Sequence, residues 1–179
     1  MSKKVLILST SFRKGSNSEV LAKEFEKGAR EAGHHTETVC FHDKTINFCT
    51  GCLVCQKTKR CVIRDDADII AQKMLTADVL VFATPIYFYE MSGQMKTMLD
   101  RSKPLFPADY AFRDVYLLAA AADEEESAMD GAVKGLTGWI DCFEKTSLKA
   151  VVRCTGVTDP GDIRGNDALR EACQLGKTL

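Results

Sequence analysis

Short apolar segments alternate with longer amphipathic ones from one end of the chain to the other. Continuous apolar runs without a helical period are typical of parallel strands that are buried on both faces. We expect strands over residues 4–9, 36–41, 78–83, 115–121 and 149–154. Apolar positions three and four residues apart predict helices over residues 17–32, 66–75, 92–101, 126–144 and 167–177. This alternation of strand and helix is the pattern of an α/β protein.

Five strands alternating with five helices predict an open parallel sheet with helices on both faces, in three layers α/β/α. A length of 179 residues without a linker or repeat suits one domain over residues 1–179. Residues 43–65 have no clear period and are expected to form a cysteine-rich insertion loop. In such sheets ligands bind beyond the carboxyl ends of the strands, where the strand order reverses. We therefore expect a site at the loops 9–18, 84–91 and 121–127.

The first of these loops is rich in hydrogen-bond donors and precedes a predicted helix. Ser11, Ser16, Asn17 and Ser18 supply side-chain donors, and Arg13 supplies a cation that can bind a phosphate oxygen. The free N–H groups and the positive dipole end of the helix also favour an anion. The loop lacks the glycine patterns of nucleotide hydrolases and dinucleotide folds, so these features predict the phosphate site of a mononucleotide. The alternative is a hydroxyl-rich helix cap that binds no ligand.

The second loop carries Pro85 and three aromatic residues in a row, Tyr87, Phe88 and Tyr89. Pro85 suits a rigid turn at a strand end, and the aromatic rings could pack on a flat ligand. The alternative is that the rings pack on neighbouring helices or on a partner subunit. The third loop is expected to close the far side of the same site. Its run of alanines, Ala121 among them, would let the backbone approach a ring closely.

Both motif-bearing loops resemble those of the NADPH-dependent FMN reductases and iron–sulfur flavoproteins. Residues 11–18, Ser-Phe-Arg-Lys-Gly-Ser-Asn-Ser, resemble the family's phosphate loop, although such proteins often carry glycine at the position of Thr10. Residues 84–87, Thr-Pro-Ile-Tyr, and 92–96, Ser-Gly-Gln-Met-Lys, resemble the turn after its third strand and the helix that follows. The resemblance implies a flavodoxin-like, doubly wound fold that binds FMN, with Pro85, Ile86, Tyr87 and Phe88 against the ring. It also implies a homodimer or homotetramer with the flavin near a subunit contact.

Four of the eight cysteines fall within the insertion loop, as Cys49, Cys52, Cys55 and Cys61 in a C-x2-C-x2-C-x5-C pattern. Four thiolates this close together can bind one compact [4Fe–4S] cluster, whereas zinc sites usually use two pairs separated by a longer arm. The spacing also resembles the compact motif of the iron–sulfur flavoproteins. Reduced thiols or a redox-active pair are the alternatives.

Composition narrows the range of partners and compartments. The formal net charge of −1 gives no indication of a nucleic-acid partner. No apolar run reaches the length of a membrane span, and the first apolar run is too short for a signal peptide. We therefore expect a cytoplasmic protein that binds neither nucleic acid nor membrane.

These features together predict an enzyme, a flavin-dependent NAD(P)H oxidoreductase of the FMN reductase type. FMN would take a hydride from NAD(P)H and pass electrons to a flavin, a quinone or a similar small acceptor. The flavin carries the chemistry, so no catalytic side chain is expected. One alternative is an electron carrier in which FMN and an iron–sulfur cluster relay electrons between protein partners. Another is a redox or metal sensor that uses the cysteines alone.

Overall fold

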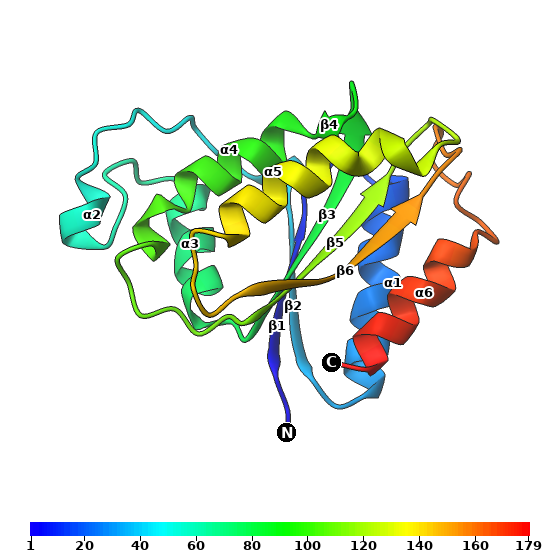
Figure 1. The fold of residues 1–179 in the computed structure, drawn as a ribbon, viewed down its shortest axis with the longest axis horizontal. Helices are drawn as coiled ribbons and strands as arrows, with labels where there is room; N and C mark the ends of the chain where they lie inside the picture. Colours follow the sequence, from blue (N-terminus) through cyan, green and yellow to red (C-terminus); the bar gives the residue numbers. More distant parts are fainter.

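The central feature of the computed structural model, which describes all residues from Met1 to Leu179, is a sheet of parallel strands in the order β2-β1-β3-β5-β6 (Figure 1). The strands are β1 (Lys4–Ser9), β2 (His35–Cys40), β3 (Val79–Tyr87), β4 (Glu90–Met91), β5 (Asp114–Ala120) and β6 (Ser147–Cys154). The short β4 pairs antiparallel with the end of β3. This strand order is that of a doubly wound, flavodoxin-like sheet, and the predicted fold class is confirmed.

Helices cover both faces of the sheet. They are α1 (Asn17–Glu31), α2 (Cys55–Thr58), α3 (Asp66–Thr76), α4 (Gly93–Arg101), α5 (Asp130–Ile140) and α6 (Asp167–Lys177), with 3-10 turns η1 (Phe41–Asp43), η2 (Lys103–Leu105) and η3 (Glu126–Met129). Figure 1 shows α1 and α6 on one side of the sheet and α3, α4 and α5 on the other. Alternate residues of a strand point to opposite faces, so Val5 and Ile7 pack with α1 and α6, whereas Leu6 and Leu8 join the core beneath the other three helices.

Side-chain caps fix where four of the helices begin. Ser16, Asp65, Ser92 and Asn166 each accept a hydrogen bond from a backbone N–H in the first turn of α1, α3, α4 and α6. Such caps satisfy donors that have no partner inside the helix. The caps at Ser16 and Ser92 place two helix N-termini at the carboxyl edge of the sheet.

The structure differs from the sequence prediction around the third strand and the fifth helix. β3 runs on to Tyr87 because Thr84 and Pro85 still lie beside β5, and the chain then turns back through β4. The helix expected over residues 126–144 is a 3-10 turn followed by a shorter α5, which ends at Ile140. Its glycines allow close packing: a Cβ on Gly131 would lie 2.4 Å from the carbonyl oxygen of Tyr89.

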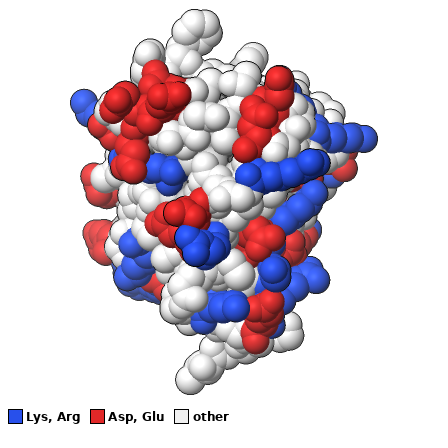
Figure 2. Space-filling model, turned by 90° about the vertical axis from the view of Figure 1, so that its right-hand side faces the viewer, with Lys and Arg blue, Asp and Glu red and all other residues white.

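The face formed by α1 and α6 carries both kinds of charge. Figure 2 shows Lys and Arg side chains interspersed with Asp and Glu over this face. Arg30 pairs with Glu26 along α1 at 2.7 Å, and Lys177 of α6 pairs with Glu31 at 2.8 Å. Exposed pairs of this kind contribute little stability, and they leave no large area of one sign on this side. None of the helices has the length and apolar character that a membrane crossing needs.

Candidate functional site

A hollow of about 190 Å³ lies at the carboxyl edge of the sheet, where the strand order reverses between β1 and β3. Three loops, those after β1, β5 and β6, meet the end of β3 there. The lining residues are Ser11, Arg13, Ser16, Asn17, Ser18, Pro85, Ile86, Tyr87, Ala120, Ala122, Val157 and Thr158. The structure thus brings together the two motif-bearing loops, which are far apart in the sequence. We call this hollow the switch-point pocket.

Two of the residues expected in the site lie outside the switch-point pocket. Phe88 is 101% exposed at the tip of the β3–β4 turn. Ala121 is buried in the core beneath α3, α4 and α5, while its neighbours Ala120 and Ala122 line the pocket. The alternation of side chains at a strand end explains the second difference, because one residue in two faces each side.

The amino end of α1 forms one end of the pocket. Ser16 Oγ accepts a hydrogen bond from Glu19 N at 3.2 Å, and Ser18 Oγ lies 3.3 Å from Ser16 Oγ. The backbone N–H groups of Asn17 and Ser18 donate to no acceptor within the protein. Free N–H groups, hydroxyls and the positive end of the helix dipole therefore converge on this end of the pocket.

Glu19, the acidic residue in the first turn of α1, is not a free charge at the pocket. The Glu19 carboxylate accepts a hydrogen bond from Gly15 N at 2.8 Å and pairs with Lys23 at 2.6 Å. Burial would raise the pKa of Glu19, but the hydrogen bonds from Lys23 and Gly15 outweigh it and hold the pKa below its usual value. The carboxylate is thus neutralised by its own helix, and the anion-binding character of the helix start is preserved.

The loop after β6 closes the pocket on a side that the sequence analysis did not assign. Arg13 Nη1 donates to the carbonyl oxygen of Thr158 at 3.0 Å, and Asn17 Nδ2 donates to that of Asp159 at 3.1 Å. Val157 and Thr158 therefore join the lining. The only available signal was the Gly, Pro and Asp content of residues 156–165, which marks a loop but no contact. Asn17 Oδ1 remains buried without a hydrogen-bond partner.

The end of β3, at Pro85, Ile86 and Tyr87, is held by buried hydroxyl groups. Ser92 Oγ lies 3.1 Å from Thr10 Oγ1 and 3.2 Å from Thr84 Oγ1, and Ser92 N donates to Thr84 Oγ1 at 3.1 Å. These three side chains belong to the ends of β1 and β3 and to the cap of α4. Thr10 therefore helps to set the position of the end of β3.

A second hollow of about 480 Å³ adjoins the switch-point pocket and shares Tyr87 with it. It lies between the first loop, the insertion loop and the start of α4. Its lining is Phe12, Ile46, Phe48, Tyr87, Gly93, Gln94 and Thr97, so it contains three aromatic rings and no charged side chain. We call it the aromatic hollow. Such a lining suits a flat, uncharged molecule.

The four cysteines of the insertion loop lie on a stretch that includes the short α2. Cys49 and Cys52 are exposed, Cys61 is half-buried and Cys55 is buried, and all four are free thiols. Burial raises the pKa of Cys55, and the nearby Cys61, Cys49 and Cys52 raise it further. A hydrogen bond with the backbone of Val54 lowers the pKa of Cys52. The four thiols are neighbours, but no three of them are gathered as the ligands of one metal ion.

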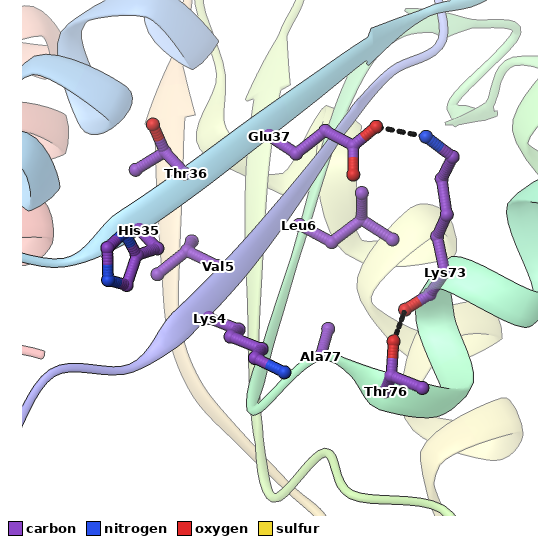
Figure 3. Close-up of a pocket in the computed structure, with 9 residues that line it drawn as sticks. All are labelled: Lys4, Val5, Leu6, His35, Thr36, Glu37, Lys73, Thr76 and Ala77. Atoms are coloured by element: carbon purple, nitrogen blue, oxygen red, sulfur yellow. Dashed lines mark hydrogen bonds and ion pairs between the residues drawn. The ribbon is translucent and has the colours of Figure 1, made fainter.

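A further hollow of about 280 Å³ lies at the amino ends of the strands, on the opposite edge of the sheet (Figure 3). Lys73 and Glu37, which both line it, form an ion pair, and Val5 and Leu6 of β1 are also among its lining residues. No helix N-terminus lines it, and it is remote from the point where the strand order reverses. We therefore place the candidate site at the switch-point pocket.

The fold is flavodoxin-like, and its candidate site lies at the switch point of the sheet. A sequence model of the NADPH-dependent FMN reductase family matches residues 3–152. The chain belongs to that family.

Individual relatives agree with this assignment. A protein of Bacillus subtilis (strain 168), named as an NAD(P)H-dependent FMN-containing oxidoreductase, is 31% identical over 187 residues and covers 96% of each chain. An iron–sulfur flavoprotein of Methanocaldococcus jannaschii is 39% identical over 102 residues, which are 57% of this chain and 53% of that protein. The match thus spans about half the length of that relative.

The fold has a solved counterpart. The NAD(P)H:quinone oxidoreductase of Methanothermobacter marburgensis superposes with a TM-score of 0.79 at 18% identity, covering 100% of this chain and 96% of that one. At this level of identity the comparison establishes the shared fold.

Proposed function

We propose that this protein binds FMN in the switch-point pocket and transfers electrons from NAD(P)H to a small acceptor such as a quinone or a free flavin. The observation that carries the proposal is the meeting of two chemistries in one pocket. Free N–H groups and serine hydroxyls at the start of α1 suit a phosphate, and the end of β3 at Pro85–Tyr87 suits a flat ring. The family assignment supports the same cofactor.

The residues present fit FMN in detail. Ser11, Ser16 and Ser18, with the N–H groups of Asn17 and Ser18, would hold the phosphate. The unpartnered Asn17 Oδ1 needs a donor, and a ribityl hydroxyl provides one. Ala120 and Ala122 have small side chains and let the backbone approach a ring from the far side.

Bound FMN supplies hydride acceptance, and the chain supplies position and shielding. The buried hydroxyls of Thr10, Thr84 and Ser92 hold the end of β3 in place, so a bound ring would contact a rigid backbone there. Arg13 joins the first loop to Thr158 and keeps the pocket narrow around the ligand. Tyr87 lines both hollows, so a substrate in the aromatic hollow would lie next to the cofactor.

The enzyme test is steady-state oxidation of NADH and NADPH by the FMN-loaded protein with a soluble quinone. We expect turnover that depends on both FMN and quinone. Phe48→Ala should raise KM for the quinone by about 2- to 10-fold, since an aromatic contact contributes roughly 0.5–1.5 kcal/mol. Phe106→Ala is the matched control, because Phe106 is also exposed, 57% against 79% for Phe48, and lines neither hollow. Absence of turnover with bound FMN would refute the proposed activity.

We further propose that Cys49, Cys52, Cys55 and Cys61 bind a [4Fe–4S] cluster, which would make electron transfer to a protein partner a second candidate function. Four thiolates at this spacing suit such a cluster in chemistry, and the relative in M. jannaschii is named an iron–sulfur flavoprotein. Gathering them requires the exposed part of the loop to close. Anaerobic purification with iron and sulfide analysis tests this, with Cys49→Ser as the variant and Cys142→Ser, another exposed cysteine, as the control. Iron-free protein from such a preparation would favour a role for the thiols alone, as in a sensor.

A second copy of the chain is the partner we propose for the tip of the β3–β4 turn. Phe88 and Tyr89 have φ of 50° and 64°, a left-handed conformation that costs roughly 1–2 kcal/mol for a residue other than glycine. Exposed aromatic rings on a strained turn next to a pocket are typical of a contact surface. Sedimentation should show a dimer or tetramer that Phe88→Ser weakens, and a monomeric wild-type protein would contradict this.

The free thiols suit the reducing cytoplasm, where we place the protein.

A further inference from the structure

One buried side chain holds both ends of the part of the chain that carries the four cysteines. Arg101, the last residue of α4, is 1% exposed. Its Nη1 donates to the carbonyl oxygen of Asn47 at 2.6 Å, and its Nη2 donates to that of Ile63 at 3.1 Å. These carbonyls lie immediately before and after residues 48–62, which we call the cysteine segment. A single guanidinium therefore closes the segment at its base.

Asp65 completes this closure. Its two oxygens accept from Arg101 Nη1 at 2.8 Å and Nη2 at 2.7 Å. The same carboxylate accepts from Asn47 N at 2.9 Å and caps α3 through Ala67 N at 3.1 Å. Burial would raise the pKa of Asp65, but the hydrogen bonds from Arg101 and Asn47 hold it well below its usual range. We call Arg101 and Asp65 the clamp.

One donor of the clamp is left over. Arg101 Nε is buried and has no hydrogen-bond partner. Cys61 stands two residues before Ile63, whose carbonyl oxygen accepts from Arg101 Nη2. A buried donor without an acceptor is unfavourable, so this N–H needs an acceptor that the metal-free chain does not provide.

We propose that Arg101 is a positioning residue for the cysteine segment, which it closes at the base and whose Cys61 sulfur accepts a hydrogen bond from Nε when the thiols bind a metal. This rests on the proposed metal-binding role of the cysteines. With the ends already joined, the four thiols can gather without the entropic cost of closing the loop. The hydrogen bond to a ligating sulfur would orient it, as outer partners of metal ligands commonly do.

The clamp also relates the cysteine segment to the switch-point pocket. α4 ends at Arg101 and begins beside Ser92, whose hydroxyl contacts Thr10 and Thr84 at the edge of the pocket. Its nine residues span roughly 13 Å at 1.5 Å per residue. One rigid helix therefore fixes the separation between the proposed flavin and metal sites.

Titration of the metal-free protein with Co²⁺ under anaerobic conditions tests the clamp, with thiolate-to-cobalt absorption as the readout. Arg101→Lys and Asp65→Asn should weaken Co²⁺ binding by about 10- to 100-fold, the usual effect of losing an outer partner. FMN affinity, measured by quenching of flavin fluorescence, should stay within about twofold and show that the domain is folded. Arg60→Lys is the control, because Arg60 pairs with Asp68 of α3 and does not connect the two ends of the cysteine segment to each other.

The outcomes separate the two ideas. Wild-type protein that gives no thiolate-to-cobalt absorption refutes the metal-binding role and the bond to Cys61 with it. If Arg101→Lys binds Co²⁺ as tightly as wild-type protein does, the positioning role of the clamp is refuted and the metal-binding role of the cysteines stands. If the variants do not fold, hydrogen exchange on metal-free wild-type protein decides: the amide of Asn47, which donates to Asp65, should exchange much more slowly than those of residues 49–54. Equal exchange rates would overturn the closure.

Discussion

Ser18→Ala tests the phosphate site through a side chain whose loss leaves the helix intact. Ser16 Oγ caps α1 by accepting from Glu19 N, whereas Ser18 Oγ has only the 3.3 Å contact with Ser16 Oγ. Ser18 is buried, so removing its hydroxyl should lower the free energy of unfolding by less than about 1 kcal/mol, the contribution of one weak hydrogen bond. Ser16→Ala removes the cap as well and should lower it by about 1 kcal/mol.

The effect on cofactor affinity follows from the charge of the phosphate. A hydrogen bond to a charged group contributes about 1.5–3 kcal/mol, and each 1.4 kcal/mol is a tenfold change in Kd. FMN should therefore bind Ser18→Ala about 10- to 150-fold more weakly than the wild-type protein. Riboflavin has the ring and the ribityl chain without the phosphate, so its affinity should be unchanged.

Fluorescence titration of both proteins with both flavins gives the four dissociation constants. The difference between FMN and riboflavin isolates the contribution of the phosphate, in the manner of a double-mutant cycle. If Ser18→Ala weakens the binding of FMN and of riboflavin equally, or weakens the binding of neither, the start of α1 does not bind the phosphate. The assignment of the switch-point pocket to FMN would then fail.

Three further predictions concern packing and ionisation. Gly131→Ala places a Cβ 2.4 Å from a backbone oxygen of the β3–β4 turn and should destabilise the fold by about 1–3 kcal/mol in urea denaturation. A Cβ on Gly138 would meet no atom within 4 Å, so Gly138→Ala should stabilise α5 by up to about 1 kcal/mol. The native pKa of Asp65 lies below its unfolded value, so its contribution is present above about pH 4 and is lost as the pH falls through the native pKa. Asp65→Asn should therefore lower stability at pH 7 and reduce its fall in acid, as followed by circular dichroism. Burial raises the pKa of Cys154 to about 11, so timed alkylation at pH 8 should modify the exposed Cys52 long before Cys154.

Each of these has a result that would contradict it. Equal stabilities of Gly131→Ala and Gly138→Ala would show that the β3–β4 turn does not pack against α5. If the stability of wild-type protein and of Asp65→Asn falls equally in acid, the clamp does not hold this carboxylate ionised. Mass spectrometry that finds Cys154 modified together with Cys52 would show that the core beneath α1 and α6 opens readily.

The sequence by itself determined the type and order of the elements. The apolar runs at β1, β3 and β5 and the helical spacing of α1, α3 and α6 are local patterns, because the side-chain periods of strand and helix act over a few residues. Helix starts at Ser16 and Ser92 followed for the same reason, since a cap and its N–H partner are three residues apart. Alternation of strand and helix then limits the topology to a doubly wound sheet with its site at the switch point.

Only the tertiary structure decided which side chains share that site. The strand register turns Ala121 into the core and Ala120 and Ala122 toward the pocket, and the hairpin directs Phe88 into solvent. Val157 and Thr158 enter the lining through a loop whose sequence shows only that it is a loop. Arg101 joins Asn47 to Ile63 across the fold. These are contacts between residues distant in sequence, set by how layers pack and strands align, and no local period of the sequence carries that information.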